Sequence, residues 1–266
     1  MKKTTFRRLF FTLLMFLALT PMARATDNIG SRNQGSARTL DGTIFVLTCY
    51  VSETGWTQPE VEGFSALMRE AEDWLVEQAK AYGKEVTFVN GTAGLDMPLL
   101  FDEIVSGNGV GDEPVNLVSK VMNKLGYSNG IEYIQWLNDS IDCDNSLVLM
   151  VANKPGRDYS MAYKDTFDPY MYFLEGSMLY TSYSDGQPGC AAGIAHEMCH
   201  LFGAEDLYAT FIQSAENEAR ARELFPDDIM LRVSYDMNSL KIDKLTAWFI
   251  GLTEEMKDWY TSFICK

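Results

Sequence analysis

The chain of 266 residues contains only two histidines, His196 and His200, and they lie four residues apart. Side chains at this spacing stack on one face of a helix, so both imidazoles can reach a single metal ion. Their neighbours over residues 193–202 are mostly apolar, which predicts a buried helix from about Ala191 to Gly203. Two imidazoles buried without partners would be costly, so the segment favours a metal-binding helix.

The residues around this helix can supply the other parts of a reactive metal site. Glu197 lies beside the histidines, where it can take a proton from a metal-activated water molecule and pass it to a leaving amine. Two histidines under-coordinate a metal, so a third protein ligand is needed. Gly203 can turn the chain back, and Asp206 follows three residues later with a suitable carboxylate. The adjacent Glu205 is the alternative ligand.

The pattern His196-Glu197-x-x-His200-x-x-Gly203-x-x-Asp206 resembles the signature of the metzincin zinc peptidases. Aspartate replaces the usual third histidine, as in snapalysin-like members. The resemblance implies one catalytic zinc held by the histidines and the aspartate, with Glu197 as general base. It also implies an endopeptidase that binds a protein or peptide substrate in extended form along an edge strand. We expect that strand within residues 170–183.

Two further metzincin features have candidates downstream of the motif. Metzincins carry a methionine turn beneath the zinc, and Met230 in Pro-Asp-Asp-Ile-Met is the first candidate, with Met237 as the alternative. Either methionine can instead be a core residue, because the chain holds 14 of them. In some metzincins a tyrosine near this turn assists the oxyanion, and Tyr235 and Tyr208 are the candidates.

The hydrophobic pattern predicts an α/β (α+β) fold: a mixed twisted sheet, the metal-binding helix beneath it, and a smaller C-terminal half that is mostly helical or irregular. Thr57 and Glu60 form a potential capping box at the start of the first helix, and Gly83 suits its end. The expected strands are residues 43–51, 85–90, 145–152 and one or two within 170–183. The expected helices are residues 59–82, 115–125 (resuming at 131–137), 191–203, 211–224 and 242–250.

The N-terminal residues have the layout of a secretory signal peptide: a basic start, an apolar run and a small-x-small site ending at Ala25. We therefore expect an exported protein, extracellular or periplasmic, with no membrane attachment after cleavage. The expected organisation is a signal peptide at 1–25, a flexible lead-in at 26–40 and a single catalytic domain at 41–266, with halves at 41–203 and 204–266.

The expected mature chain is strongly acidic. Cleavage removes five basic residues and no acidic one, so the formal net charge moves from −15 to −20. This charge argues against nucleic acid or an anionic membrane as partner, and we expect a monomer. Export permits disulfides, but an odd number of cysteines leaves at least one unpaired, and Cys199 in the motif is the candidate. The five are Cys49, Cys143, Cys190, Cys199 and Cys265.

Three other interpretations remain open. In a thermolysin-like (gluzincin) site Glu218 would be the third ligand, but Arg222 stands where that family has a supporting aspartate. In a non-catalytic zinc-binding or adhesion module the metal would be structural, which gives no role to Glu197. Calcium could bind an acidic cluster whose spacing matches no EF-hand loop, so a solvated loop is favoured there. The cluster consists of Asp139, Asp142 and Asp144.

Overall fold

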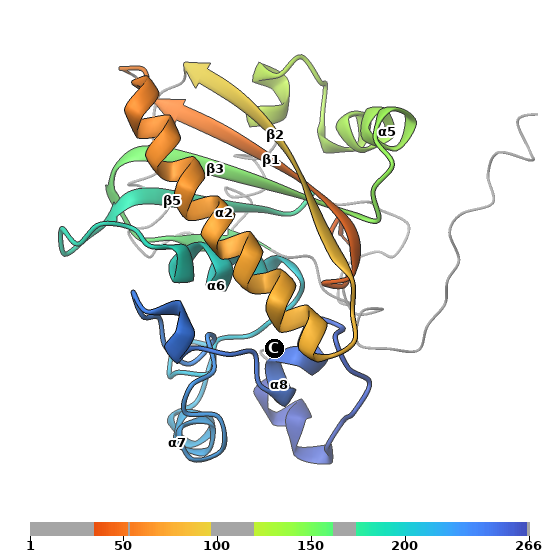
Figure 1. The fold of residues 1–266 in the computed structure, drawn as a ribbon, viewed down its shortest axis with the longest axis vertical. Coiled ribbons are helices and arrows are strands. Elements are labelled where there is room, and N and C mark those ends of the chain that lie inside the picture. Colours follow the sequence, from red (N-terminus) through yellow and green to blue (C-terminus); the bar gives the residue numbers. More distant parts are fainter. Residues whose placement is uncertain (1–34, 53, 97–119, 162–173, 265–266) are drawn as a thin grey trace, which may run out of the picture.

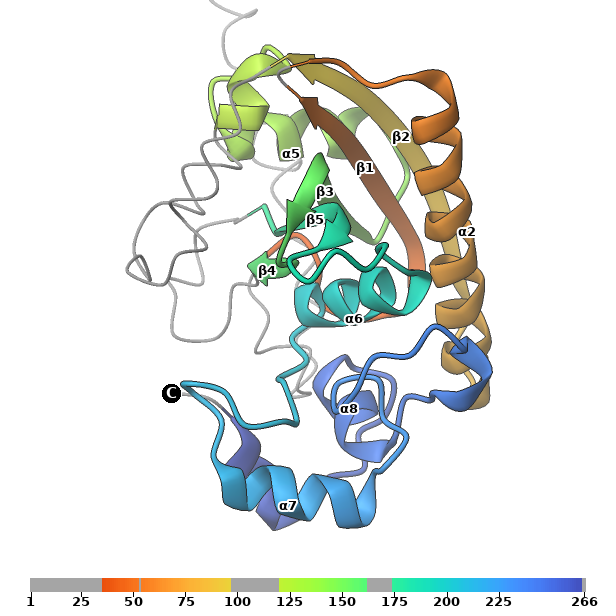
Figure 2. The same cartoon turned by 90° about the vertical axis from the view of Figure 1, so that its left-hand side faces the viewer.

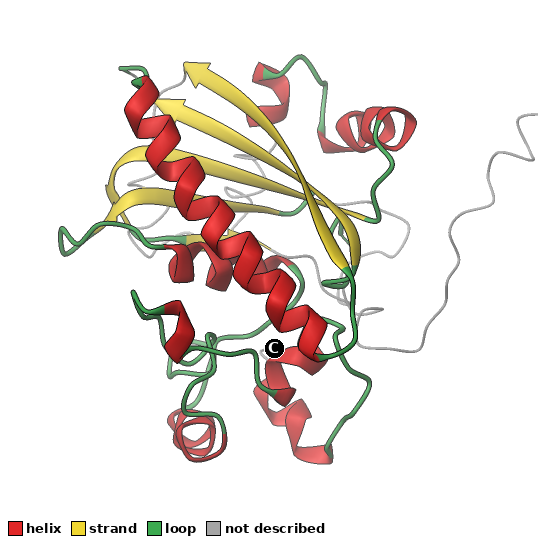
Figure 3. Cartoon of the chain, in the orientation of Figure 1, coloured by secondary structure: helices red, strands yellow, loops and turns green. Residues whose placement is uncertain are grey.

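The computed structural model describes residues 35–52, 54–96, 120–161 and 174–264. One twisted sheet forms the upper part of the molecule, with α2 and α6 on one of its faces and α5 on the other (Figures 1 and 2). A lower part made of short helices and loops follows α6 along the chain and lies beneath it (Figure 3). The mixed α/β class expected from the sequence is confirmed.

The sheet has five strands in the order β2-β1-β3-β5-β4. The first four run parallel to their neighbours, and β4 is antiparallel to β5. The expectation of an edge strand within 170–183 is wrong for the described part of that range, because β5 lies between β3 and β4. The strands are β1 (Gly42–Ser52), β2 (Val86–Asp96), β3 (Asn145–Gly156), β4 (Tyr159–Met161) and β5 (Gly176–Tyr183).

The long helix α2 (Gln58–Ala81) crosses one face of the sheet. It begins as predicted, because the Glu60 carboxylate accepts the backbone N–H of Thr57 at 2.8 Å. Its apolar side chains recur at helical spacing and are buried against the sheet and α6, which makes α2 the cover of the main core. These side chains are Phe64, Met68, Ala71, Leu75 and Ala79.

The opposite face of the sheet is covered by α5 (Gly130–Ser140). Its side chains Tyr133 and Leu137 pack with residues of β1 and β3 in a second core. The Asn129 side chain accepts the Glu132 backbone N–H at 3.0 Å and caps the helix. The preceding helix is expected at 115–125, and its described part is helical over residues 120–124.

The C-terminal half is joined to the upper part through α2. Trp74 donates to the carbonyl of Met237 at 3.1 Å, and Tyr82 donates to that of Ile242 at 2.8 Å. Two helices begin later than expected, with Ser214 and Asp243 at their N-cap positions, and the Ser214 side chain caps the first by accepting the Asn217 N–H. The elements are α7 (Ala215–Leu224), η2 (Met237–Ser239), α8 (Lys244–Phe249) and η3 (Asp258–Phe263).

The described end of the expected lead-in is packed onto the fold. Ala37 and Leu40 are fully buried, and the Ala37 N–H donates to the Glu175 carboxylate at 2.5 Å. The folded part of the chain therefore begins before residue 41, the boundary expected from the sequence. The expected signal peptide, residues 1–25, lies outside the described residues. Among the described helices, none combines the length and the apolarity that crossing a membrane requires.

Candidate metal centre

The helix α6 (Ala191–Leu201) presents the motif from a buried position beside β4, β5 and α2. His196 is 4% exposed and Glu197 is 7% exposed. The helix ends where Gly203 adopts a positive φ of 97°, a conformation that glycine reaches without a steric penalty. The Ala204 N–H then closes onto the Cys199 carbonyl at 3.0 Å. This tight reversal directs the following residues back toward the helix.

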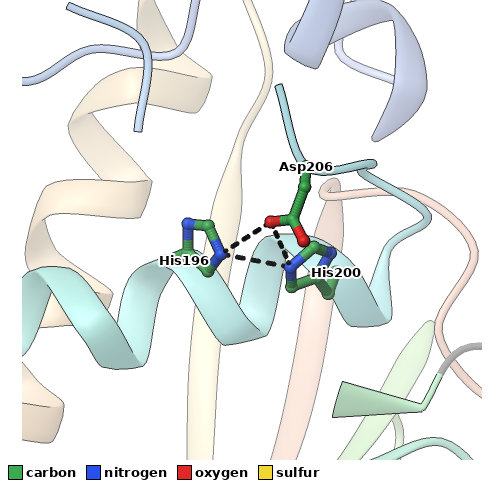
Figure 4. Close-up of side chains that lie close together, drawn as sticks. All are labelled: His196, His200 and Asp206. Atoms are coloured by element: carbon green, nitrogen blue, oxygen red, sulfur yellow. Dashed lines mark hydrogen bonds and ion pairs between the residues drawn. The ribbon is translucent and has the colours of Figure 1, made fainter. Parts of the chain in front are cut away.

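The reversal brings three side chains to one point (Figure 4). The Nε2 atoms of His196 and His200 are 3.1 Å apart. Asp206 Oδ1 lies 3.3 Å from the first and 3.2 Å from the second. Three donors held about 2.0–2.1 Å from one ion at tetrahedral angles are about 3.4 Å apart. The triangle therefore fits a tetrahedral metal with its fourth position free of these ligands.

Backbone carbonyls fix the orientation of both imidazole rings. The Nδ1 of His196 lies 2.9 Å from the Ile229 carbonyl oxygen, and the Nδ1 of His200 lies 2.8 Å from that of Ala204. A carbonyl only accepts, so each Nδ1 carries the proton and donates. In the neutral rings both Nε2 lone pairs then face the shared point, as in proteins whose metal-binding histidines are oriented by a hydrogen bond at the other nitrogen.

The charges of the centre are strongly coupled. Burial raises the pKa of Asp206, but the two histidines outweigh burial and hold it well below its usual range. Burial lowers the pKa of His200, but the carboxylates of Asp206 and Glu197 outweigh this and raise it to about 9. Without a metal the centre thus holds a His200–Asp206 ion pair at neutral pH. A metal must displace that proton to bind.

Glu197 lies on the same helix but is not one of the three converging side chains. Its Oε2 accepts the hydroxyl of Ser160, on β4, at 2.6 Å. Its Oε1 makes no hydrogen bond to any described residue. This carboxylate therefore lies on the helix that carries both histidines, and Ser160 restrains one of its two oxygens. Sequence reasoning missed Ser160, because a lone serine 37 residues before Glu197 carries no recognisable pattern.

The two candidate tyrosines lie in different surroundings. The ring of Tyr208 stacks beside His196, with centroids 6.3 Å apart and planes at 24°. Burial and the nearby Asp206 carboxylate raise the pKa of Tyr208, so its hydroxyl stays protonated. Tyr235 is 60% exposed and donates to the Pro188 carbonyl at 2.7 Å. Only Tyr208 is thus placed at the edge of the metal-binding group.

Of the two candidate methionines, Met230 belongs to the turn that contacts the centre. The preceding residue, Ile229, supplies the carbonyl that binds His196, and the Met230 carbonyl accepts the Leu207 N–H at 2.9 Å. The buried Asp228 carboxylate fixes the turn by accepting the Met230 N–H at 2.8 Å and the Thr246 hydroxyl at 2.9 Å. Met237 instead lies at the junction with α2, through its carbonyl contact with Trp74.

The alternative metal ligands are not brought to this point. Metal ligands come from His, Cys, Asp and Glu side chains. Across the described residues, His196, His200 and Asp206 form the only group of three or more whose ligand atoms lie within 4.8 Å of one another. Glu218 instead accepts the Ala209 N–H at 2.7 Å and pairs with Arg222 on α7. Glu205, the alternative third ligand, is buried but outside the group. The acidic cluster Asp139, Asp142 and Asp144 forms no such group either.

The cysteines are not used as ligands or disulfides in the described part of the chain. Cys199 is an unpaired, buried thiol, as expected, and burial raises its pKa. Burial likewise raises the pKa of Cys49 to about 12, so both thiols stay protonated. Cys265 lies outside the described residues. The unpaired cysteines are Cys49, Cys143, Cys190 and Cys199.

Comparison of the sequence with models of known protein families and with curated proteins gave no match. The description of the centre therefore rests on its geometry. That geometry is a buried His-His-Asp group able to hold a metal ion, with Glu197 on the helix that carries both histidines.

Proposed function

We propose that this protein is an exported, metzincin-type zinc endopeptidase. The observation that carries the proposal is the convergence of His196, His200 and Asp206 at 3.1–3.3 Å from one another, with Glu197 beside them. A structural zinc site is commonly closed by four protein ligands, whereas a catalytic one has three and keeps a position open. Three converging ligands and an adjacent carboxylate that does not join them favour the catalytic type.

The donor set supports zinc as the metal. Two imidazole nitrogens and one carboxylate oxygen make up a common catalytic zinc site, and their mutual distances suit tetrahedral geometry. The fixed Nδ1–H donors leave both Nε2 atoms available. When bound, zinc would supply Lewis-acid polarisation of the substrate carbonyl and activation of a water nucleophile.

The chain's own acid–base group for hydrolysis is Glu197. In our proposal its carboxylate takes the proton that the attacking water loses. The protonated carboxyl then delivers a proton to the amine nitrogen as the peptide C–N bond breaks. The burial of this side chain and its bond to Ser160 limit its motion. Tyr208, beside His196, is the candidate that could assist the oxyanion.

The position of the sheet supports a peptide as substrate. The strand β4 lies at the edge of the described sheet and contacts α6. An extended peptide can add to such an edge through main-chain hydrogen bonds, which would pass its backbone close to the metal-binding group. The mixed sheet, the turn at Met230 beside His196 and the smaller C-terminal half are consistent with the metzincin resemblance. Export is proposed from the composition of residues 1–25.

The experiment that tests the proposal is cleavage of denatured casein by the zinc-loaded mature chain. Glu197→Ala and a zinc chelator serve as the two controls, and metal analysis measures zinc per chain. Cleavage that both controls abolish, while Glu197→Ala still binds zinc, is the expected result. One bound zinc per chain without cleavage of casein or of a diverse peptide library would instead favour the non-catalytic zinc module.

A further inference from the structure

A serine on the edge strand contacts the proposed general base. Ser160 lies in β4 directly opposite Ser177 in β5, in the antiparallel register of the two strands. Its Oγ is 2.6 Å from Glu197 Oε2, 2.9 Å from the Glu197 backbone carbonyl and 2.5 Å from Ser177 Oγ. One hydroxyl of the sheet edge thus reaches both the side chain and the backbone of the same residue on α6.

The proton of this hydroxyl has a preferred direction. Ser160 has a single O–H to donate, and an ionised carboxylate is a stronger acceptor than a backbone carbonyl or a second hydroxyl. Ser177, which is fully buried, then donates its own proton to Ser160 Oγ. The result is a chain of hydrogen bonds from Ser177 through Ser160 to Glu197 Oε2. Successive bonds in such a chain strengthen one another.

We propose that Ser160 is a positioning residue for the general base, an inference that rests on the peptidase function proposed above. It holds Oε2 of Glu197 at the sheet edge and leaves Oε1 without a hydrogen bond from any described residue, so that this oxygen can accept the proton to be moved. A glutamate side chain has three rotatable bonds, so an unrestrained Glu197 would sample rotamers that do not face the metal-binding group. Ser177 supports the same rotamer indirectly by fixing the Ser160 hydroxyl.

The geometry also joins the base to the strand along which we expect the substrate to lie. Both Ser160 and the proposed peptide-binding edge belong to β4. Because the hydroxyl belongs to that strand, it would keep the general base at a fixed distance and orientation from the bound peptide. Small displacements of a reacting group are costly in catalysis, which gives this connection a functional consequence.

A matched pair of variants separates the hydroxyl from the shape of the side chain. Ser160→Thr keeps the hydroxyl, whereas Ser160→Val has nearly the same shape without it. Because general acid–base catalysis contributes about 10²–10⁴-fold, we expect Ser160→Val to lower kcat by roughly tenfold or more. KM and zinc affinity should stay within about twofold of the wild type. Ser160→Thr should recover most of kcat, and Ser177→Ala should show a smaller loss than Ser160→Val.

The control is Thr87→Val on β2, an exposed hydroxyl at the opposite edge of the sheet, which should leave kcat unchanged. Thermal unfolding checks that each variant is folded. If wild type cleaves peptides and Ser160→Val retains its kcat, or Ser160→Thr loses as much as Ser160→Val, Ser160 does not position the base and the peptidase function stands. If wild type binds zinc but cleaves nothing, the peptidase function fails and this inference fails with it.

Discussion

Replacing Asp206 with alanine should remove one of the three proposed metal ligands while leaving the helix and its two histidines in place. The side chain contributes Oδ1, which lies 3.2–3.3 Å from the Nε2 atoms of His196 and His200. Its backbone carbonyl accepts the Gln213 amide at 3.0 Å, a contact that the substitution keeps. The matched variant is Glu205→Ala, which removes a neighbouring buried carboxylate that does not converge on the histidines.

The size of the expected loss follows from the number of ligands. Zinc bound by four protein ligands in small domains gains about 10–16 kcal/mol, or roughly 2.5–4 kcal/mol for each ligand. A loss of that size corresponds to roughly 10²–10³-fold in the dissociation constant. Asp206→Ala should therefore bind zinc roughly 10²–10³-fold more weakly than the wild type, whereas Glu205→Ala should stay within a few-fold of it.

Competition with a chromogenic chelator at fixed pH measures both dissociation constants, and circular dichroism of the metal-free proteins checks their folding. The assignment of Asp206 as third ligand would be refuted if Glu205→Ala were folded and bound zinc a hundredfold more weakly while Asp206→Ala bound it normally. Glu205 would then be the third ligand. Equal affinities in all three proteins would mean that the two histidines bind the metal without either carboxylate.

Three other outcomes can be measured on the same protein. Glu197→Ala should keep one zinc per chain and lose at least about 10²-fold in kcat/KM for a peptide substrate; loss of zinc as well would make its role structural. Because the pKa of metal-free His200 is raised to about 9, a bound proton competes with zinc below that pH. Zinc affinity, measured by chelator competition, should therefore rise by about tenfold per unit between pH 6 and 8, and an affinity independent of pH would contradict the ion pair. Burial raises the pKa of Asp228 from 3.8 to about 7, so the folded state binds this proton more tightly than the unfolded state. The resulting stability is fully present below about pH 4 and is lost as pH rises through 7. It amounts to a few kcal/mol at about 1.4 kcal/mol per pKa unit. Denaturant unfolding of the metal-free protein should show this loss of stability between about pH 4 and 7. If a folded Asp228→Asn variant lost stability over the same pH range, Asp228 would be excluded as the cause.

The sequence predicts the metal-binding group because its members are close along the chain. His196 and Asp206 are ten residues apart, and one helix with one glycine turn is enough to bring them together. The sequence predicts the inner strands β1 and β3 equally well, because they are continuous apolar runs that suit a sheet buried on both faces. Local pattern and local geometry agree in these segments.

The parts that the sequence does not predict depend on distant contacts. The Ile229 carbonyl that orients His196 lies 33 residues after it, and Ser160 lies 37 residues before Glu197. A backbone carbonyl has no residue signature, and β4, with three residues, is too short to show a two-residue period. Residues 35–40 are polar in part and suggested a loose lead-in, yet buried Ala37 and Leu40 attach them to the core.

Contacts from outside α6 converge on this helix, and their arrangement supports the proposed catalysis over simple metal storage. The Ile229 carbonyl, the Ala204 carbonyl and the Ser160 hydroxyl each fix a different functional side chain of α6. Two of these bonds orient the proposed metal ligands, which would benefit any zinc site. The third fixes Glu197, a carboxylate that binds no metal in this geometry. Restraining a buried acidic group costs conformational entropy and desolvation, and catalysis is the function that gains from a general base held ready in a fixed position.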